Sequence, residues 1–392
     1  MNVKSFLIIS ILLSAVGVNA QGVFESSLSG SPASGADRLS IGGYTRGALF
    51  LGLIPEQDPL LRSLYSETSL KLKYAGGSWG GAFTDIRFRT GVEYGDNVHE
   101  INIREAYADF NLGRLGLRFG KQILSWGRAD GFNPTDNLTP KNYFVRSGEP
   151  DDLKQGNLLL RAQYQPFDFL RLEADLIPWY VPSQYRFDLV GMPAFVAIDP
   201  VSHPGFAWDG CAVGAKADLI FGAIEGALSW YSGYDHLPAL APGQLPAPPF
   251  TDFTVHLMQK PYRQQVFGAD FATTLLGTGL RGEFAVKIPE EDSANPFRPN
   301  TEYQWVVSLD RGFGPFRLIA AYNGKWVDDF VPADPPGEFN PALLADPTLW
   351  PFLEGMFASQ IGYYNRILFD QTHEISHTLL FRPSLQLFHE AL

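Results

Sequence analysis

The chain has 392 residues, of which 45% are hydrophobic and 14% aromatic, and it carries a formal net charge of −12. Its single cysteine, Cys211, excludes a disulfide framework and a zinc site built from cysteines, and we interpret it as a small residue within a strand. The acidic balance argues against nucleic acid as a partner, because such a partner requires a basic face.

The first twenty residues are typical of an export signal. Lys4 supplies the positive start, residues 6–18 the apolar run, and the VNA stretch at 18–20 a small-residue cleavage site. This apolar run is too short for a transmembrane helix, and no later run reaches the roughly 18 apolar residues that a helix needs. We therefore predict a signal peptide at 1–20, followed by a flexible periplasmic segment at 21–37.

Residues 81–94 show the pattern that dominates the rest of the chain. Apolar and threonine side chains from Thr84 to Val92 fall on one face, and Asp85, Arg87 and Arg89 fall on the other. The same two-residue period recurs in later segments. Such alternation indicates strands with one face against an apolar medium and the other against water.

About fourteen such strands are predicted, and the lengths of their connections alternate. The strands begin near residues 39, 63, 81, 101, 115, 157, 169, 210, 223, 263, 279, 302, 316 and 361. The expected long connections are 55–62, 95–100, 127–156, 179–209, 235–262, 290–301 and 328–360. Short turns on one side and long loops on the other are typical of outer-membrane barrels.

The predicted fold class is therefore all-β, an antiparallel up-and-down transmembrane β-barrel over residues 38–392. The N-terminus is expected in the periplasm and the long loops outside the cell. A further strand begins after Pro383 and the sequence stops at Leu392. Because bacterial single-chain barrels have even strand numbers, we expect the sequence to be truncated at its C-terminus and the intact barrel to have about sixteen strands.

The charged strand faces supply the candidate pore lining. The wall residues are Asp85, Arg87, Arg89, Glu105, Asp109, Arg118, Arg161, Arg171, Arg281 and Arg317. The inward charges are nearly balanced, so the acidity lies largely in the loops, where an acidic mouth would favour cations while inner arginines slow or guide anions. The alternative, that these charges only pair and keep the bore hydrated, stays open.

The loop at 127–156 is the candidate constriction. Its Asn-Pro and Thr-Pro steps exclude a helix or strand, and a loop of this length is usually functional. The candidate constriction residues are Arg128, Asp130, Asp136, Lys141, Arg146 and Asp151. The alternative is a loop that lies over the mouth of the barrel.

This region also carries a family resemblance. Gly120-Lys121-Gln122, Trp126-Gly127, Asp130, Asn133-Pro134, Asp136 and Pro140 resemble the G-R/K-Q…W-G…D…N-P-x-D motif of porin-like outer-membrane proteins of Gram-negative bacteria. The resemblance covers about twenty residues. It implies a channel in the outer membrane, and in many porins the third outer loop, which 127–156 would be, narrows the bore.

The function predicted from these features is passive diffusion of small hydrophilic solutes or ions, with outer-membrane lipid as a further partner. No cofactor, metal or catalytic residue is predicted, and a homo-oligomer is left open. The alternatives are an outer-membrane enzyme and a surface-binding barrel with a closed bore.

Four sequence motifs could suggest other chemistry. His373-Glu374-Ile375-Ser376-His377 matches H-E-x-x-H, which binds zinc on a helix; on a strand its histidines would be about 13 Å apart. The surrounding residues fit a strand or an apolar helix. The G-x-S-x-G match at 76–80 and the G-x-G-x-x-G match at 277–282 are both expected in turns between strands. Asp130, Asn133 and Asp136 depart from calcium-loop spacing.

Overall fold

The computed structural model describes most of the chain after the first 37 residues. The described residues are 38–52, 60–129, 132–147, 149–185, 187, 195–204, 210–243, 254–290, 297–332, 343 and 346–385. The predicted signal peptide and the segment at 21–37 therefore lie outside the described residues, as does the end of the chain from 386. Among the described residues, no helix combines the length and apolar character needed to span a membrane.

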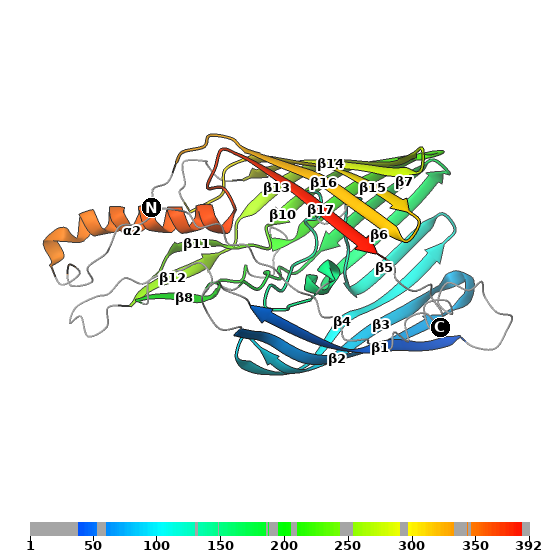
Figure 1. Cartoon of the computed structure of the whole chain (residues 1–392), viewed down its shortest axis with the longest axis horizontal. Coiled ribbons are helices and arrows are strands. Elements are labelled where there is room, and N and C mark those ends of the chain that lie inside the picture. Colours follow the sequence, from blue (N-terminus) through cyan, green and yellow to red (C-terminus); the bar gives the residue numbers. More distant parts are fainter. Residues whose placement is uncertain are drawn as a thin grey trace. The chain divides into compact units, whose positions relative to one another are not determined.

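Fourteen strands form one sheet whose spatial order follows the order of the chain (Figure 1). They are β1 (Leu39–Gly52), β2 (Leu60–Ala75), β3 (Gly80–Glu93), β4 (Asp96–Leu112), β5 (Leu115–Gln122), β6 (Asn157–Phe167), β7 (Leu170–Ile177), β9 (Ala212–Phe221), β10 (Ile224–Tyr234), β13 (Arg263–Leu275), β14 (Thr278–Pro289), β15 (Glu302–Phe313), β16 (Phe316–Val327) and β17 (Ile375–Leu385). Successive strands run antiparallel. The predicted all-β, antiparallel up-and-down fold class, that of up-and-down β-barrels, is confirmed.

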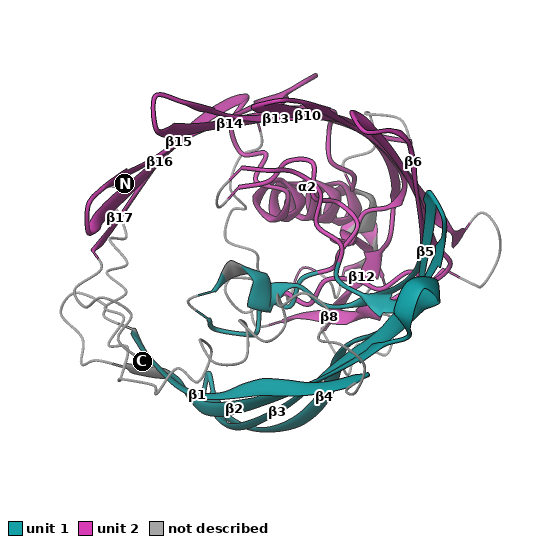
Figure 2. Ribbon diagram, turned by 90° about the vertical axis from the view of Figure 1, so that its right-hand side faces the viewer, with its two compact units in different colours: residues 1–123, 141–160, 392 teal, residues 124–140, 161–391 magenta. Residues whose placement is uncertain are grey.

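The chain divides into two compact units (Figure 2). Unit 1 contains residues 1–123 and 141–160, including β1 to β5. Unit 2 contains residues 124–140 and 161–391, including β7, β9, β10 and β13 to β17. The predicted constriction loop is therefore divided between them, and we call residues 124–140 the first loop segment and 141–156 the second loop segment.

Both units bury the charged side of their strands and expose the apolar side. In unit 1, Glu67 is 1% exposed, whereas Ile101 is 72% exposed. In unit 2, Glu173 is buried and Leu228 is exposed. Water-soluble proteins show the opposite arrangement, because exposing contiguous apolar surface to water is unfavourable. The apolar faces thus require a non-aqueous surrounding.

A two-residue turn joins β3 to β4, where a long loop was predicted at 95–100. Tyr94 and Gly95 both have positive φ, 53° and 95°. Positive φ at both central positions characterises the type I′ turn, whose twist matches that of the paired strands. The predicted loop was wrong, and β4 begins at Asp96 rather than near residue 101.

A second, smaller sheet forms within predicted loops of unit 2. It contains β8 (Val196–Val201), β11 (Ala239–Pro242) and β12 (Val255–Lys260), in the order β11-β12-β8. β12 pairs antiparallel with β11 and parallel with β8. The connections predicted at 179–209 and 235–262 therefore include regular structure.

A helix, α2 (Trp350–Leu368), replaces the strand that was predicted to begin near 361. Leu353, Phe357, Ile361 and Tyr364 are buried on it, at spacings that place them on one helical face. They pack with Leu240 and other buried residues of the small sheet. A 3₁₀ turn (Pro347–Leu349) immediately precedes α2. We call α2, β8, β11 and β12 together the accessory core.

Asn365 joins α2 to β11. Its Nδ2 donates to the Leu240 carbonyl and its Oδ1 accepts from the Leu240 amide, each at 2.8 Å. Replacing Asn365 with leucine should destabilise the accessory core by about 2–4 kcal/mol, because two buried backbone groups lose their partners. Hydrogen exchange of the α2 amides measures this, with Glu354→Gln at an exposed α2 position as control. Equal exchange in both variants would contradict the assignment.

Candidate functional site: the charged strand faces and the 124–156 loop

Glu67 is the centre of a charged cluster on β1, β2 and β3 of unit 1. The strand register places Arg46 and Arg89 directly opposite it. Arg46 lies 2.7 Å and Arg89 2.5 Å from its carboxylate, and Arg87 lies 3.3 Å away. Opposite charges on facing strand positions stabilise the pairing. The cluster therefore holds three arginines on the charged face.

The second loop segment attaches to this cluster through Asp152. Its carboxylate lies 2.7 Å from Arg46, 2.8 Å from Arg87 and 3.0 Å from Arg104. Ser147 also donates its hydroxyl to this carboxylate. Burial raises the pKa of Asp152, but Arg87, Ser147 and Arg46 outweigh burial and hold that pKa well below its usual range. Asp152 therefore stays ionised and fastens the loop segment to the strands.

A β-bulge brings Arg104 into this contact. Asp85 pairs with Glu105 but Ile86 pairs with Ile103, so Arg104 is the extra residue of β4. Strict alternation would place Arg104 on the face opposite to Glu105, so Arg104 was not predicted in the wall. In the loop, Asp151 was predicted as a constriction residue and its neighbour Asp152 was not. The EPDD stretch offered two adjacent carboxylates without a signal to choose between them.

Most predicted wall residues of unit 1 pair on the charged face. Asp85 accepts the Ser69 hydroxyl at 2.7 Å. Asp109 and Arg118 form an ion pair at 2.6 Å. Glu105 instead accepts the backbone amide of Ile123 at 3.0 Å, at the end of β5.

The predicted residues of the second loop segment have different surroundings. Arg146 donates to the Tyr94 hydroxyl at 2.7 Å. Lys141 forms an isolated bridge with Lys154 through the backbone. Asp151 has an exposed carboxylate 2.9 Å from Lys154, while its backbone carbonyl accepts from Arg104. For Asp151 it is thus the carbonyl, rather than the carboxylate, that bonds to a strand of the wall.

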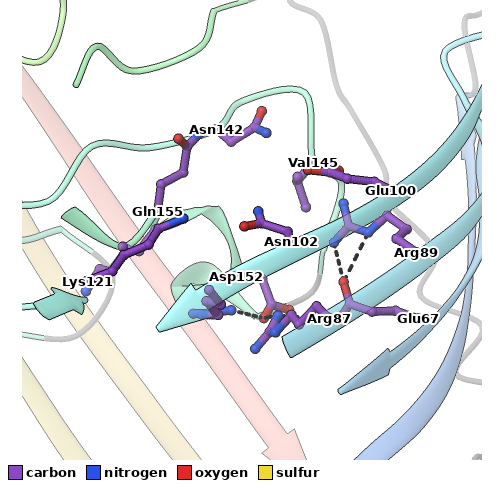
Figure 3. A pocket seen from close by; sticks show the side chains of 13 residues that line it. Glu67, Arg87, Arg89, Glu100, Asn102, Lys121, Asn142, Val145, Asp152 and Gln155 are labelled. Atoms are coloured by element: carbon purple, nitrogen blue, oxygen red, sulfur yellow. Dashed lines mark hydrogen bonds and ion pairs between the residues drawn. The ribbon is translucent and has the colours of Figure 1, made fainter. Parts of the chain in front are cut away.

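A cavity of about 70 Å³ lies between the second loop segment and the charged faces of β2 to β5 in unit 1 (Figure 3). Its lining includes Glu67, Arg87 and Arg89 at one end. Lys121 and Gln155 lie at the other end in Figure 3. Lys121 was named in the sequence analysis only as part of the family motif.

In unit 2, the first loop segment attaches through Arg128, which is surrounded by carboxylates of the charged face. Arg128 pairs with Asp270 of β13, with Asp218 of β9 at 3.1 Å and with Glu225 of β10 at 3.5 Å. Burial lowers the pKa of Arg128, but the carboxylates of Asp270 and Asp218 outweigh burial and raise that pKa. The predicted constriction residue thus bridges three strands.

Glu283 of β14 holds the backbone of the same segment. Its carboxylate accepts the amides of Arg128 and Ala129, each at 2.6 Å, and the Thr135 hydroxyl at 2.9 Å. Gly127 has φ of 93°, and a Cβ there would lie 2.4 Å from the Glu283 carboxylate. Glycine at this motif position therefore permits the carboxylate to approach the backbone.

Trp126 precedes this glycine and is fully buried. Its indole Nε1 donates to Glu173 at 2.9 Å, and Glu173 also pairs with Arg161. Arg171 occupies the register position opposite Asp218. In unit 2, Arg128 and Arg161 thus pair with acidic residues of the described sheet, and Arg171 lies opposite one in the strand register.

The remaining predicted residues are spread along unit 2 or lie outside the described part. Arg317 pairs with Asp310 near the β15–β16 turn, and Arg281 contributes to the electrostatic surroundings of Asp310. Asp130 is not among the described residues. Asp136 donates its backbone amide to the Asn133 carbonyl at 3.2 Å. Within unit 2, the predicted wall arginines therefore have different acidic residues as neighbours.

His236 lies just after β10 and is buried within unit 2. Its Nδ1 is 2.7 Å from the Val181 carbonyl oxygen, and its ring stacks with Tyr180 at 6.4 Å between centroids. Burial lowers the pKa of His236, and the bond to Val181 together with the carboxylates of Asp235 and Asp136 only partly offsets this. The imidazole is therefore held neutral.

The unfolding midpoint should fall as the pH drops below about 6.5, the ordinary histidine value. Because the folded pKa of His236 lies below the unfolded one, its contribution to stability is fully present above that value and is lost as pH falls through the folded pKa. Thermal unfolding of wild type, His236→Gln and the exposed-site control His99→Gln from pH 8 to 5 checks this. The prediction fails if His236→Gln retains the full drop.

The H-E-x-x-H match at 373–377 does not lie on a helix. His373 lies before β17, and His377 lies on it, 2.9 Å from the Tyr322 hydroxyl. Within the described residues, no group of three or more metal-binding side chains occurs. The match at 76–80 includes a 3₁₀ turn (η1, Gly77–Trp79) between β2 and β3. The match at 277–282 begins in the β13–β14 turn and continues into β14, so the first match lies in a strand connection and the second only begins in one.

No known family model matches the sequence, and no curated protein matches it. Among solved structures, the chain is similar to OmpT, an outer-membrane protein of Vibrio cholerae, with 12% identity and a TM-score of 0.42 over 75% of this chain and 78% of that one. It is also similar to the outer-membrane channel DcaP of Acinetobacter baumannii, with 12% identity and a TM-score of 0.43 over 74% and 79%. For OmpF of Salmonella typhi the identity is 11% and the TM-score 0.42, over 74% and 77%.

Proposed function

We propose that the chain is an outer-membrane channel for passive diffusion of small hydrophilic solutes or ions. The observation that carries this proposal is the inverted burial: charged residues such as Glu67 are buried, while Ile101 and many other large apolar side chains of the strands are exposed. Strands of a membrane barrel need apolar side chains against lipid and polar ones against an aqueous interior. The N-terminus is then periplasmic and the long loops extracellular.

The 127–156 loop is proposed as the constriction of this channel. Two observations support it, one in each unit: Arg128 pairs with acidic residues of the charged face, and Asp152 pairs with arginines of the charged face. A loop lying only over the mouth would not need ion pairs with mid-strand residues such as Arg87. The candidate residues Asp136, Lys141 and Arg146 belong to the same proposal.

The accessory core favours one second candidate, a surface-binding barrel with a closed bore. The accessory core lies in loops that are proposed to be extracellular. It has a buried apolar interior of its own, which includes Leu240, Leu257 and Phe357. Such a folded loop assembly could present a binding surface whether or not the bore conducts.

Single-channel recording separates the two functions. Purified chain reconstituted in a planar bilayer should give discrete conductance steps, and a salt gradient should give a reversal potential whose sign reports ion preference. Bilayers without protein, and protein denatured before addition, serve as controls. Absence of steps from correctly folded chain would overturn the channel proposal and favour the closed-bore candidate.

A further inference from the structure

The cavity of unit 1 shown in Figure 3 has a composition suited to a negatively charged ligand. It is lined by five basic residues against three acidic ones. The basic residues are Arg87, Arg89, Arg104, Lys121 and Lys154, and the acidic residues are Glu67, Glu100 and Asp152. Three amide side chains, Asn102, Asn142 and Gln155, complete the polar lining.

Two of the three carboxylates are already neutralised by arginines. Glu67 pairs with Arg89 and Arg46, and Asp152 pairs with Arg87 and Arg46. A cation entering the cavity would therefore compete with guanidinium groups for both carboxylates. Competition of this kind disfavours cation binding, because charge-assisted hydrogen bonds of guanidinium to carboxylate are strong.

The buried polar atoms of the lining that make no hydrogen bond are donors. They are Gln155 Nε2 and Arg87 Nε, the latter 3.5 Å from the Asp85 carboxylate. No buried side-chain oxygen of the described lining residues is left in this state. A buried donor without a partner costs free energy, which an acceptor oxygen in the cavity would recover.

Lys121 adds the charge that such an acceptor would meet. Its stem packs against the second loop segment, since a Cβ at Gly156 would lie 3.0 Å from Lys121 Cγ. Glycine at 156 thus lets the segment approach the lysine closely. Lys121 and Gln155 are consequently held on the same cavity from two parts of unit 1, β5 and the second loop segment.

We propose that this cavity binds one small oxyanion group, a carboxylate or a phosphate, between Lys121 and Gln155. The volume of about 70 Å³ admits a single such group rather than a whole sugar or peptide. We further infer that small anions bearing such a group are the preferred solutes of the channel, and this part rests on the proposed function. Binding of the group to the cavity does not depend on the channel function. Conduction requires that binding be weak enough for release, so we expect a Kd of about 1–10 mM.

Isothermal titration calorimetry of the folded full chain in detergent tests this, with inorganic phosphate and acetate as separate titrants. At least one titrant should bind saturably, and Lys121→Met and Gln155→Leu should each weaken binding about tenfold or more. Lys260→Met removes the same charge from an exposed position of β12 and should bind as wild type. Lys121→Arg should retain binding, and Gln155→Leu carries the test if Lys121→Met does not fold.

The outcomes separate this inference from the channel proposal. Saturable binding of phosphate alone or of acetate alone supports the site and identifies the oxyanion. The oxyanion site is overturned if neither titrant binds saturably, or if binding is unchanged in both Lys121→Met and Gln155→Leu. Water would then be the partner of Gln155 Nε2 and Arg87 Nε. If the chain binds an oxyanion but shows no conductance steps, the channel proposal is wrong and the binding site stands. If the chain conducts but binds no oxyanion, only the binding site is wrong.

Discussion

Replacing Arg128 with methionine is expected to raise single-channel conductance by about twofold or more and to shift ion preference toward cations. The substitution deprives Asp218, Asp270 and Glu225 of the guanidinium that they share, while Asp218 keeps Lys216 at 3.1 Å. Truncating one partner of a buried ion pair costs about 3–5 kcal/mol, which weakens the attachment of the first loop segment. Conductance and reversal potential in a salt gradient measure both effects.

Arg311→Met is the matched control for this experiment. Arg311 is exposed near the end of β15 and donates to Thr278 rather than to the loop. Its removal should leave both conductance and ion preference near the wild-type values. If Arg128→Met behaves like this control, the first loop segment does not limit the bore.

Replacing Asp152 with asparagine should produce the opposite shift, toward anions, again with a conductance increase. The change deprives Arg46, Arg87 and Arg104 of a carboxylate that they share, and it thereby loosens the second loop segment. The guanidinium groups of Arg46 and Arg87 then stand on the charged face with Glu67 as their remaining shared acceptor. Reversal potential under a salt gradient reports the sign of the change.

The chain supplies a control one residue away. Asp151 has an 80% exposed carboxylate that lies 2.9 Å from Lys154 of the same loop segment. Asp151→Asn removes the same charge and keeps the backbone carbonyl that accepts from Arg104. Asp151→Asn should change ion preference far less than Asp152→Asn. Equal shifts in both variants would mean that the charge of the loop, and not the contact of Asp152 with the strands, sets the ion preference.

The strand pattern and the charged strand faces could be predicted from the sequence because both depend on a two-residue period. That period placed Arg87 and Arg89 on the charged face, where the structure has them paired with Glu67. Arg128 was found by a different signal, its position in a long turn-rich loop after Trp126. Its acidic partners come from strands about ninety or more residues away in the chain, so local pattern could not name them.

Three predictions failed where the local structure departs from regular strand alternation. Tyr94 takes positive φ, which is uncommon for a tyrosine, so the tight turn before β4 was overlooked. The bulge that redirects Arg104 breaks the alternation without altering the residue types around it. Within α2, residues 350–368 carry a helical apolar stripe, but their end was taken for the beginning of a strand.

The accessory core was missed because its pairings are non-local. β8 and β12 are six residues each, too short for a clear period, and they pair in parallel although β9, β10 and β11 lie between them in the chain. Parallel partners require a crossover rather than a hairpin, and a sequence offers no turn signal for one.

The accessory core also constrains the order in which the protein can mature. Its interior joins Val196, Leu240, Val255 and Tyr364, so no piece of it is complete until the chain has been made through α2. Contacts over such long separations form slowly, because the intervening chain must be ordered first. Until then the apolar sides of α2 and of the small sheet lack the neighbours that bury them, so an incomplete chain exposes this apolar surface.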